Sequence, residues 1–206
     1  LGRFGTSVAR TLVRHGFTVL AIDLSAARVQ ELSSVLPHVV QLNATSVEAL
    51  RQAGVDSFEV GVCCIGEDFE SNLLATVILL KMGLKRVIAK ARTNTQKEIL
   101  LRVGAHEVIL PEHEAGMRLA RRLASGSFID YLEVSGEVGV VELVAPDAVV
   151  NQSLLEADIR NKFGLTVVAV LYRAELIVSP APDFVIQARD VLVVMGNIDA
   201  AEQFSG

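Results

Sequence analysis

The sequence predicts an α/β protein in two parts, a doubly wound parallel sheet followed by a small α+β lobe. Up to about residue 110, short apolar segments alternate with segments of helical periodicity. Such β-α alternation with short loops requires a parallel sheet. The chain also opens on a pair of glycines of the kind that begins such sheets. From Glu133 onward the hydrophobic pattern changes to one in which apolar and polar residues alternate, as in strands.

The first 23 residues have the pattern of a phosphate-binding turn. Gly2 and Gly5 have the spacing of the second and third glycines of G-x-G-x-x-G, and a helical apolar pattern follows them. Residues 18–22 are predicted to form a strand that ends at Asp23. An acid roughly 20 residues after the glycines is expected to bind a ribose hydroxyl. We therefore predict a Rossmann-like nucleotide site, whose first strand and first glycine should lie upstream of Leu1.

The following elements alternate regularly. Serines at 25 and 46 can cap helices, and glycines at 54, 83 and 104 can end them. The predicted helices are 25–34, 46–54, 72–82, 95–103 and 112–125, and the predicted strands are 39–42, 59–65, 86–91 and 107–110.

Ligands in such sheets bind at the carboxyl ends of the strands. We therefore expect one crevice to collect the glycine turn and the residues at these ends. The candidate nucleotide-binding residues are Gly2, Arg3, Phe4, Gly5, Asp23, Leu24, Asn43, Ala44, Thr45, Ile65, Gly66, Lys90, Ala91 and Glu112.

The second part is predicted to begin after a hinge-like Ser125-Gly126-Ser127 sequence. We assign 1–126 to the nucleotide-binding domain with a connecting helix, and 127–206 to a crossover segment and the C-terminal lobe. The crossover segment is the apolar stretch 128–132, which we expect to cross between subunits. The lobe has predicted strands at 138–144, 166–172, 175–178 and 190–195 and predicted helices at 154–163 and 199–204.

Composition limits the possible functions. The apolar fraction is 51% and the mean hydropathy +0.44, yet the longest mainly apolar run, 73–80, is far short of the ~18 residues of a membrane span. Strands buried on both faces and a large subunit interface explain the excess better. A net charge of −5 argues against nucleic acid as a partner. The adjacent Cys63 and Cys64 are expected to be structural thiols.

The sequence does not favour an enzyme. A small NAD-dependent dehydrogenase would need a proton-transfer group, but no Tyr-x-x-x-Lys pair exists, because Ser135 follows Tyr131 and Leu176 follows Tyr172 at that spacing. The pair His113-Glu114 suggests a zinc protease, but a methionine stands where the second histidine must be.

The combination of Leu1-Gly2-Arg3-Phe4-Gly5, Asp23, Asn43-Ala44-Thr45, Pro111-Glu112 and Val178-Ser179-Pro180-Ala181-Pro182 resembles the cytosolic RCK (KTN) regulatory subunits of bacterial Ktr-type potassium transporters. Related Trk regulators carry two such units in tandem, whereas this chain holds one. The resemblance implies homodimers assembled into an octameric gating ring. It also implies a cytoplasmic location at the inner face of the membrane, beneath a membrane-embedded potassium-translocating subunit. ATP would activate and ADP would inhibit.

The resemblance also implies residue roles. Gly2 and Gly5 would hold phosphates, Asp23 the ribose, and Asn43 and Thr45 would border the adenine. Arg3 would reach the terminal phosphate, and Glu112 would help to hold a divalent cation (Mg²⁺ or Ca²⁺) near the γ-phosphates. The C-terminal lobe would bind cyclic di-AMP through Ile159, Arg160 and Pro180.

The chemistry of the residues agrees with this reading but leaves alternatives open. Arg3 supplies charge that a triphosphate needs more than a pyrophosphate does. Glu112 would be repelled by phosphates unless a cation lay between them. Arg3 can also be a solvated first-turn residue, and Glu112 an acid favoured by the helix dipole. An NAD(H)-sensing Trk-type regulator is an alternative, since NAD shares the adenosine and the pyrophosphate.

Overall fold

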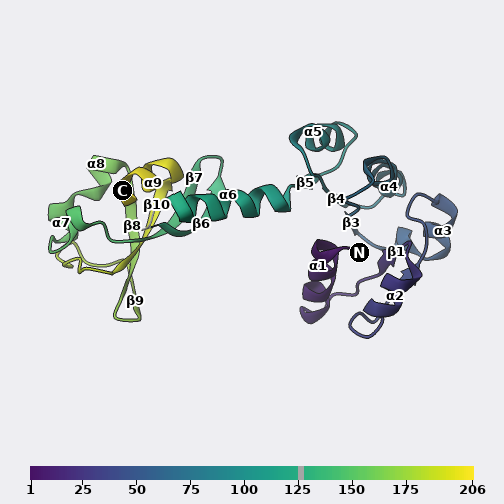
Figure 1. Ribbon diagram of the computed structural model, residues 1–206, viewed down its shortest axis with the longest axis horizontal. Coiled ribbons are helices and arrows are strands. Elements are labelled where there is room, and N and C mark those ends of the chain that lie inside the picture. The colour runs from purple at the N-terminus through teal and green to yellow at the C-terminus, as the bar shows by residue number, and fades with distance from the viewer. Residues whose placement is uncertain (125–127) are drawn as a thin grey trace. The chain divides into compact units, whose positions relative to one another are not determined.

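The computed structural model describes residues 1–124 and 128–206, which divide into two compact units, Leu1–His113 and Glu114–Gly206 (Figure 1). The division falls within helix α6 (Pro111–Ala124). The predicted domain boundary at 126/127 and the predicted Ser125-Gly126-Ser127 hinge lie outside the described residues.

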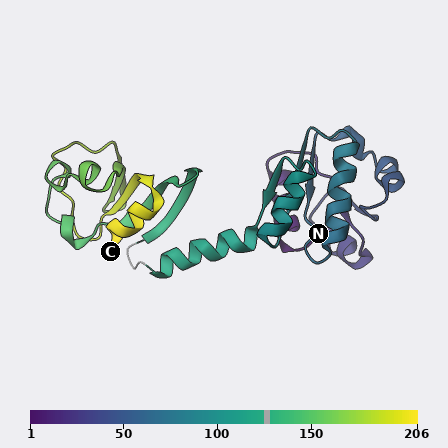
Figure 2. The ribbon, with the colours of Figure 1, turned by 90° about the horizontal axis from the view of Figure 1, so that it is seen from above.

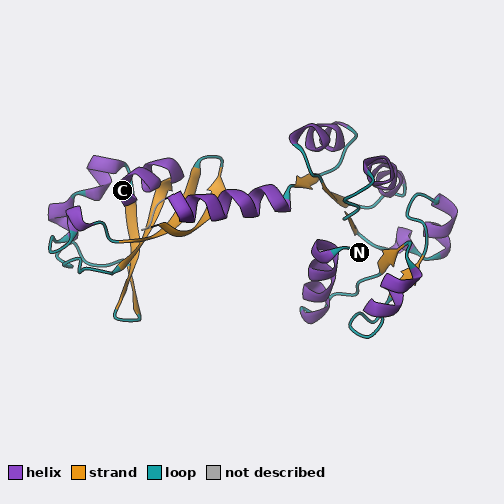
Figure 3. Ribbon diagram, viewed as in Figure 1, coloured by secondary structure: helices purple, strands orange, loops and turns teal. Residues whose placement is uncertain are grey.

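The first unit alternates strands and helices along the chain, as predicted (Figure 3). Its strands pair in parallel in two pieces, β1–β2 and β3–β4–β5. The strands are β1 (Ala21–Asp23), β2 (Val39–Gln41), β3 (Val60–Cys63), β4 (Arg86–Lys90) and β5 (Glu107–Ile109). The helices are α1 (Arg3–Arg14), α2 (Ala26–Leu32), α3 (Val47–Gln52), α4 (Phe69–Lys81) and α5 (Asn94–Arg102), with a short 3₁₀ turn at Val55–Ser57.

Side-chain caps begin four of these helices. Ser25, Ser46 and Thr93 accept hydrogen bonds from the third residue of α2, α3 and α5. Asp68 does the same for α4, so this helix begins at Phe69, three residues before the predicted start. An aspartate cap typically contributes about 1 kcal/mol and outweighs the weaker periodicity of the first turn.

Small residues let the helices pack closely on the strands. Ala21 and Ala89 are buried, and a Cβ on Gly61 would stand 2.9 Å from a Leu84 side-chain carbon. Leu100, fully buried, belongs to the core between α5 and the β3–β4–β5 piece. The helices are therefore fixed against strands whose carboxyl ends carry the predicted site.

The second unit is a five-stranded antiparallel sheet of order β6-β7-β10-β8-β9. Its strands are β6 (Phe128–Ser135), β7 (Val138–Val144), β8 (Thr166–Tyr172), β9 (Glu175–Val178) and β10 (Val191–Asn197). Its helices, besides the end of α6, are α7 (Leu154–Ala157), α8 (Ile159–Phe163) and α9 (Ile198–Ser205), with a 3₁₀ turn at Asp147–Val149.

One face of this sheet forms the core of the unit. Leu143, Leu192 and Val170 are paired neighbours on three adjoining strands and have no exposed surface. Helix α9 packs on this face (Figure 2), and the rings of Phe163 and Phe204 lie 4.7 Å apart between α8 and α9.

One local prediction for this unit was wrong. The helix predicted at 154–163 is two helices, because Asp158 adopts a left-handed conformation (φ 49°, ψ 42°) that aspartate tolerates better than most residues. The stretch 128–132 belongs to strand β6, which continues to Ser135 and pairs with β7. The turn between the two strands contains Gly136 at φ 57°, a conformation that favours glycine in hairpin turns. That this stretch crosses between subunits stays a prediction.

Candidate functional site

The start of α1 is open to an external anion. Gly2 occupies its N-cap position and offers no side-chain cap, and the first turn holds no acid. A Cβ on Gly2 would find no atom within 4 Å. The helices α2 to α5, by contrast, all have capping side chains. Since the first N–H groups of a helix lack intrahelical acceptors, those of α1 remain available for a ligand such as a phosphate.

Gly5 allows α1 to pack closely against the end of β3. The residue is buried, and a Cβ placed on it would stand 3.1 Å from the Cβ of Cys64. This confirms the packing role expected of the third glycine. Cys64 itself is free, and burial raises the pKa of its thiol to about 11, so it stays protonated at neutral pH.

Asp23 lies at the carboxyl end of β1, beside the start of α1. Its carboxylate accepts a hydrogen bond from the Ser25 N–H, at 2.8 Å, and lies beside the backbone nitrogen of Leu1. Burial acts to raise the pKa of Asp23. The hydrogen bonds that the carboxylate accepts and the charge of Arg28 outweigh burial and hold this pKa below its ordinary value. Asp23 is therefore an ionised acceptor at neutral pH.

Lys90 lies close to three other predicted residues, near the ends of β3 and β4. Its Nζ lies 2.5 Å from Oε1 of Glu112 and 6.0 Å from the centroid of the Phe4 ring. A Cβ on Gly66 would stand 3.7 Å from the same Nζ. The Lys90 side chain is only 11% exposed, whereas that of Glu112 is 68% exposed. The hydrogen bond from Lys90 lowers the pKa of Glu112.

The other predicted residues line or support this region. Asn43 Oδ1 accepts from the Thr45 N–H (2.9 Å) and hydroxyl (2.8 Å), which fixes the loop after β2. Ala44 packs against the core cluster under β3 and β4, where Ile65 also packs. Leu24 is exposed at the rim, whereas the side chain of Ala91 is buried and does not reach the surface.

Asn72 was missed as a site residue. It is 2% exposed, and its Nδ2 donates to the carbonyls of Ile65 (2.5 Å) and Lys90 (2.9 Å). This amide therefore ties the end of β3 to the end of β4.

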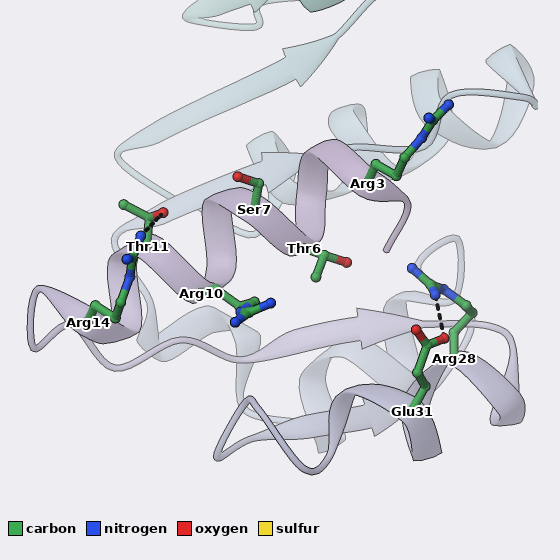
Figure 4. A pocket seen from close by; sticks show the side chains of 8 residues that line it. All are labelled: Arg3, Thr6, Ser7, Arg10, Thr11, Arg14, Arg28 and Glu31. Carbon is green, nitrogen blue, oxygen red and sulfur yellow. Dashed lines mark hydrogen bonds and ion pairs between the residues drawn. The ribbon is translucent and has the colours of Figure 1, made fainter.

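A pocket of about 430 Å³ on the flank of α1 was also missed (Figure 4). It is lined by Arg3, Thr6, Ser7, Arg10, Thr11, Arg14, Arg28 and Glu31. In Figure 4, Thr6 and Arg10 point from α1 towards the space faced by Arg28 and Glu31, whereas Arg3 points away. Arginines at 3, 10 and 14 in a helix without acids were the sequence signal.

The residues predicted for cyclic di-AMP are spread over the second unit. The side chain of Ile159 is buried in the core, Arg160 is exposed on α8, and Pro180 is half-buried in the loop after β9. In the described part of the chain, no hydrogen bond or ion pair joins Arg160 to Pro180.

The described residues contain neither a cluster of metal-ligand side chains nor a helix able to span a membrane. Residues 1–124 and 128–206 contain no group of three or more His, Cys, Asp or Glu side chains placed to hold a metal ion. In the same ranges, no helix combines the length and apolar character needed to cross a bilayer. A cation at Glu112 would therefore need other ligands besides His, Cys, Asp and Glu side chains of the described residues, such as phosphate oxygens.

Known proteins match the chain over nearly its whole length. Residues 1–111 match the TrkA-N domain and residues 138–205 match the TrkA-C domain. The Ktr system potassium uptake protein C of Bacillus subtilis (strain 168) is 33% identical over 204 residues, which cover 99% of this chain and 92% of that protein. The Ktr system potassium uptake protein A of the same strain is 31% identical over the same length and with the same coverage.

Solved structures share the fold. The crystal structure of the GsuK RCK domain has a TM-score of 0.66 and 19% identity, and the match covers 97% of this chain but 45% of that chain. The GsuK channel bound to NAD has a TM-score of 0.53 and 23% identity, covering 99% of this chain and 36% of that chain. The chain carries the TrkA-N and TrkA-C domains in that order and is 31–33% identical to the two Bacillus proteins over 99% of its length. It therefore belongs to the family of RCK regulatory subunits of bacterial Ktr potassium uptake systems.

Proposed function

We propose that this subunit senses adenine nucleotides, with ATP activating and ADP inhibiting, and thereby controls potassium flux through a membrane-embedded translocating subunit. The observation that carries the proposal is the uncapped, acid-free start of α1 with open space at Gly2. Asp23 lies beside it as an ionised acceptor for ribose hydroxyls. This acid would repel a 2′-phosphate, so NADP is disfavoured.

Arg3 is the residue proposed to distinguish ATP from ADP. It is exposed at the start of α1 and makes no hydrogen bond or ion pair within the described residues. A charge-assisted hydrogen bond to a third phosphate contributes about 1.5–3 kcal/mol, or roughly ten- to hundredfold in affinity. Only such a differential contact can shift the equilibrium between two states of a regulatory ring.

Lys90 and Glu112 are proposed to act on the phosphates together. Their ion pair is half exposed, so a divalent cation (Mg²⁺ or Ca²⁺) held by Glu112 and by phosphate oxygens would replace Lys90 as the partner of the carboxylate. The Lys90 ammonium would then be available to the phosphates. Glu112, rather than a cluster of protein ligands, is the proposed metal contact.

The proposed assembly is a homodimer that forms an octameric ring on the cytoplasmic side of the membrane. Large apolar side chains exposed on α6 (Met117, Leu119 and Leu123) and Leu74 on α4 are suited to subunit contacts. The proposed role is regulatory rather than enzymatic. Cyclic di-AMP binding by the C-terminal lobe, with Arg160 as a phosphate contact, is a further part of the proposal.

NAD(H) sensing is the second candidate. NAD presents the same adenosine and pyrophosphate to Asp23 and to the start of α1, and a channel of similar fold has been solved with NAD bound. An NAD sensor has no third phosphate for Arg3 to contact. Arg3 therefore separates the two candidates.

Isothermal titration calorimetry of the full-length protein with ATP, ADP, NAD and NADH tests this function. Arg3→Ala should weaken ATP binding roughly ten- to hundredfold and leave ADP within about twofold. Arg51→Ala, which removes an exposed arginine from α3, should change neither. Equal losses for ATP and ADP, or tight binding of NAD alone, would contradict ATP/ADP sensing.

A further inference from the structure

We propose that the pocket between α1 and α2 is a second anion site, adjoining the nucleotide site, that binds a small phosphate-bearing ligand through Arg10, Arg14 and Arg28. The pocket is lined by four arginines and one acid, Glu31, in a chain whose net charge is −5. Local charge of one sign in a concave site concentrates ions of the other sign.

The arginines of α1 lack the partners that helices usually supply. The sequence of α1 contains no acid, and Arg10 and Arg14 are one turn apart, where like charges destabilise a helix by about 0.2–0.5 kcal/mol. Within the described residues, Arg10 has no hydrogen-bond or ion-pair partner, and Arg14 donates only to Thr11, at 3.1 Å. An anion between these side chains would remove the repulsion.

Arg28 faces them from α2 and is held in place. Its Nη2 and Nε donate to the Leu1 carbonyl at 2.6 and 3.2 Å, and its Nη1 lies 2.5 Å from Glu31 Oε2. Three of the five guanidinium donors are used in this way, which leaves two for a ligand.

The pocket adjoins the nucleotide site at Arg3 and Arg28, and its far end is distinct from that site. At 1.5 Å per residue, Arg10 and Arg14 stand about 10 and 16 Å along the helix axis from Arg3. The volume of about 430 Å³ falls in the range of small-molecule sites. A concave pocket of this size suits a compact polyanion better than the flat surface of a membrane. The proposal does not depend on Arg3.

The test titrates tripolyphosphate into the full-length protein, with and without saturating ATP, by calorimetry. The double variant Arg10→Gln/Arg14→Gln is compared with Arg51→Gln/Arg102→Gln, which removes the same charge from exposed positions on α3 and at the end of α5. We expect saturable binding that persists with ATP present. The pocket variant should lose roughly tenfold or more in affinity, while the control stays within about twofold.

Equal losses in both variants, or no ATP-independent binding, would overturn the site. Sedimentation with phosphatidylglycerol vesicles separates the free ligand from a lipid headgroup. Vesicle binding that depends on Arg10 and Arg14, without binding of tripolyphosphate, would overturn the small-ligand site in favour of membrane contact. Failure of ATP to bind would contradict the proposed function but leave the tripolyphosphate result intact.

Discussion

Lys90 connects most of the predicted site at the scale of single residues. Its ammonium is nearly buried, lies over the Phe4 ring and pairs with Glu112. A buried cation is costly without a partner, so Glu112 serves Lys90 as long as no stronger anion is present. A phosphate arriving at the start of α1 would compete for this cation. The pair is therefore suited to reporting the arrival of a ligand.

Replacing Lys90 by Met is expected to return the pKa of Glu112 to its ordinary range, because the hydrogen bond from Lys90 is the main cause of its depression. A carboxyl group whose pKa is lowered by folding stabilises the folded protein at any pH above its unfolded-state pKa of about 4.3. This stability is lost as the pH falls through the folded-state pKa. The free energy of unfolding of the variant should therefore fall less on acidification than that of the wild type. Carboxyl ¹³C NMR titration measures the pKa of Glu112 in both proteins, and urea denaturation at several pH values measures their stability.

Lys85→Met provides the matched control. Lys85 pairs with Glu59 on the same unit, and its hydrogen bond lowers the pKa of Glu59. Lys85→Met should raise the pKa of Glu59 and leave that of Glu112 unchanged, and Lys90→Met should do the reverse. If the pKa of Glu112 is the same in Lys90→Met as in the wild type, the ion pair is not formed in solution.

Helix α4 acts on the site at the scale of elements. It is largely apolar, yet it carries Asn72, whose amide joins the ends of β3 and β4. The backbone carbonyl of Lys90 is thereby held by Asn72, while its ammonium pairs with Glu112. The helix thus positions the loops after two strands as well as covering the sheet.

Asn72→Ala is expected to lower the free energy of unfolding by about 2–4 kcal/mol, because it leaves two carbonyls without their donor and opens a cavity. Urea denaturation measures the loss. Asn94→Ala, at an exposed position at the start of α5, should stay within about 0.5 kcal/mol of the wild type. Losses of similar size in the two variants would mean that the buried amide does not hold the strand ends.

At the scale of the whole molecule, the local signals of the sequence were sufficient for the order of elements. Gly54 and Gly104 mark helix ends, and the predicted strands in the first unit all exist. Contacts between distant residues were not predictable in this way. The pairing of β7 with β10 and the position of Arg28 across from α1 depend on tertiary packing, which no single segment of the sequence reveals.

The same contrast between local signals and tertiary contacts applies to the site. Gly5 could be placed because its role is a close approach that a Cβ would crowd, and the structure has that approach at Cys64. Asn72 could not, because an asparagine near a helix start is usually a surface residue. The break at Asp158 was missed because a left-handed aspartate leaves the apolar periodicity of its neighbours intact.

The most direct test of the account is hydrogen–deuterium exchange of the full-length protein with and without ATP. The central claim is that an adenine nucleotide binds at the open start of α1. ATP should slow exchange in the peptide that covers residues 1–12 and in the loop after Asp23, because the phosphates would accept hydrogen bonds from the first N–H groups of α1 and the ribose hydroxyls would donate to Asp23. Exchange in the α5 peptide, residues 94–102, should not change. Unchanged exchange at residues 1–12 with saturating ATP, ADP and NAD would contradict the claim.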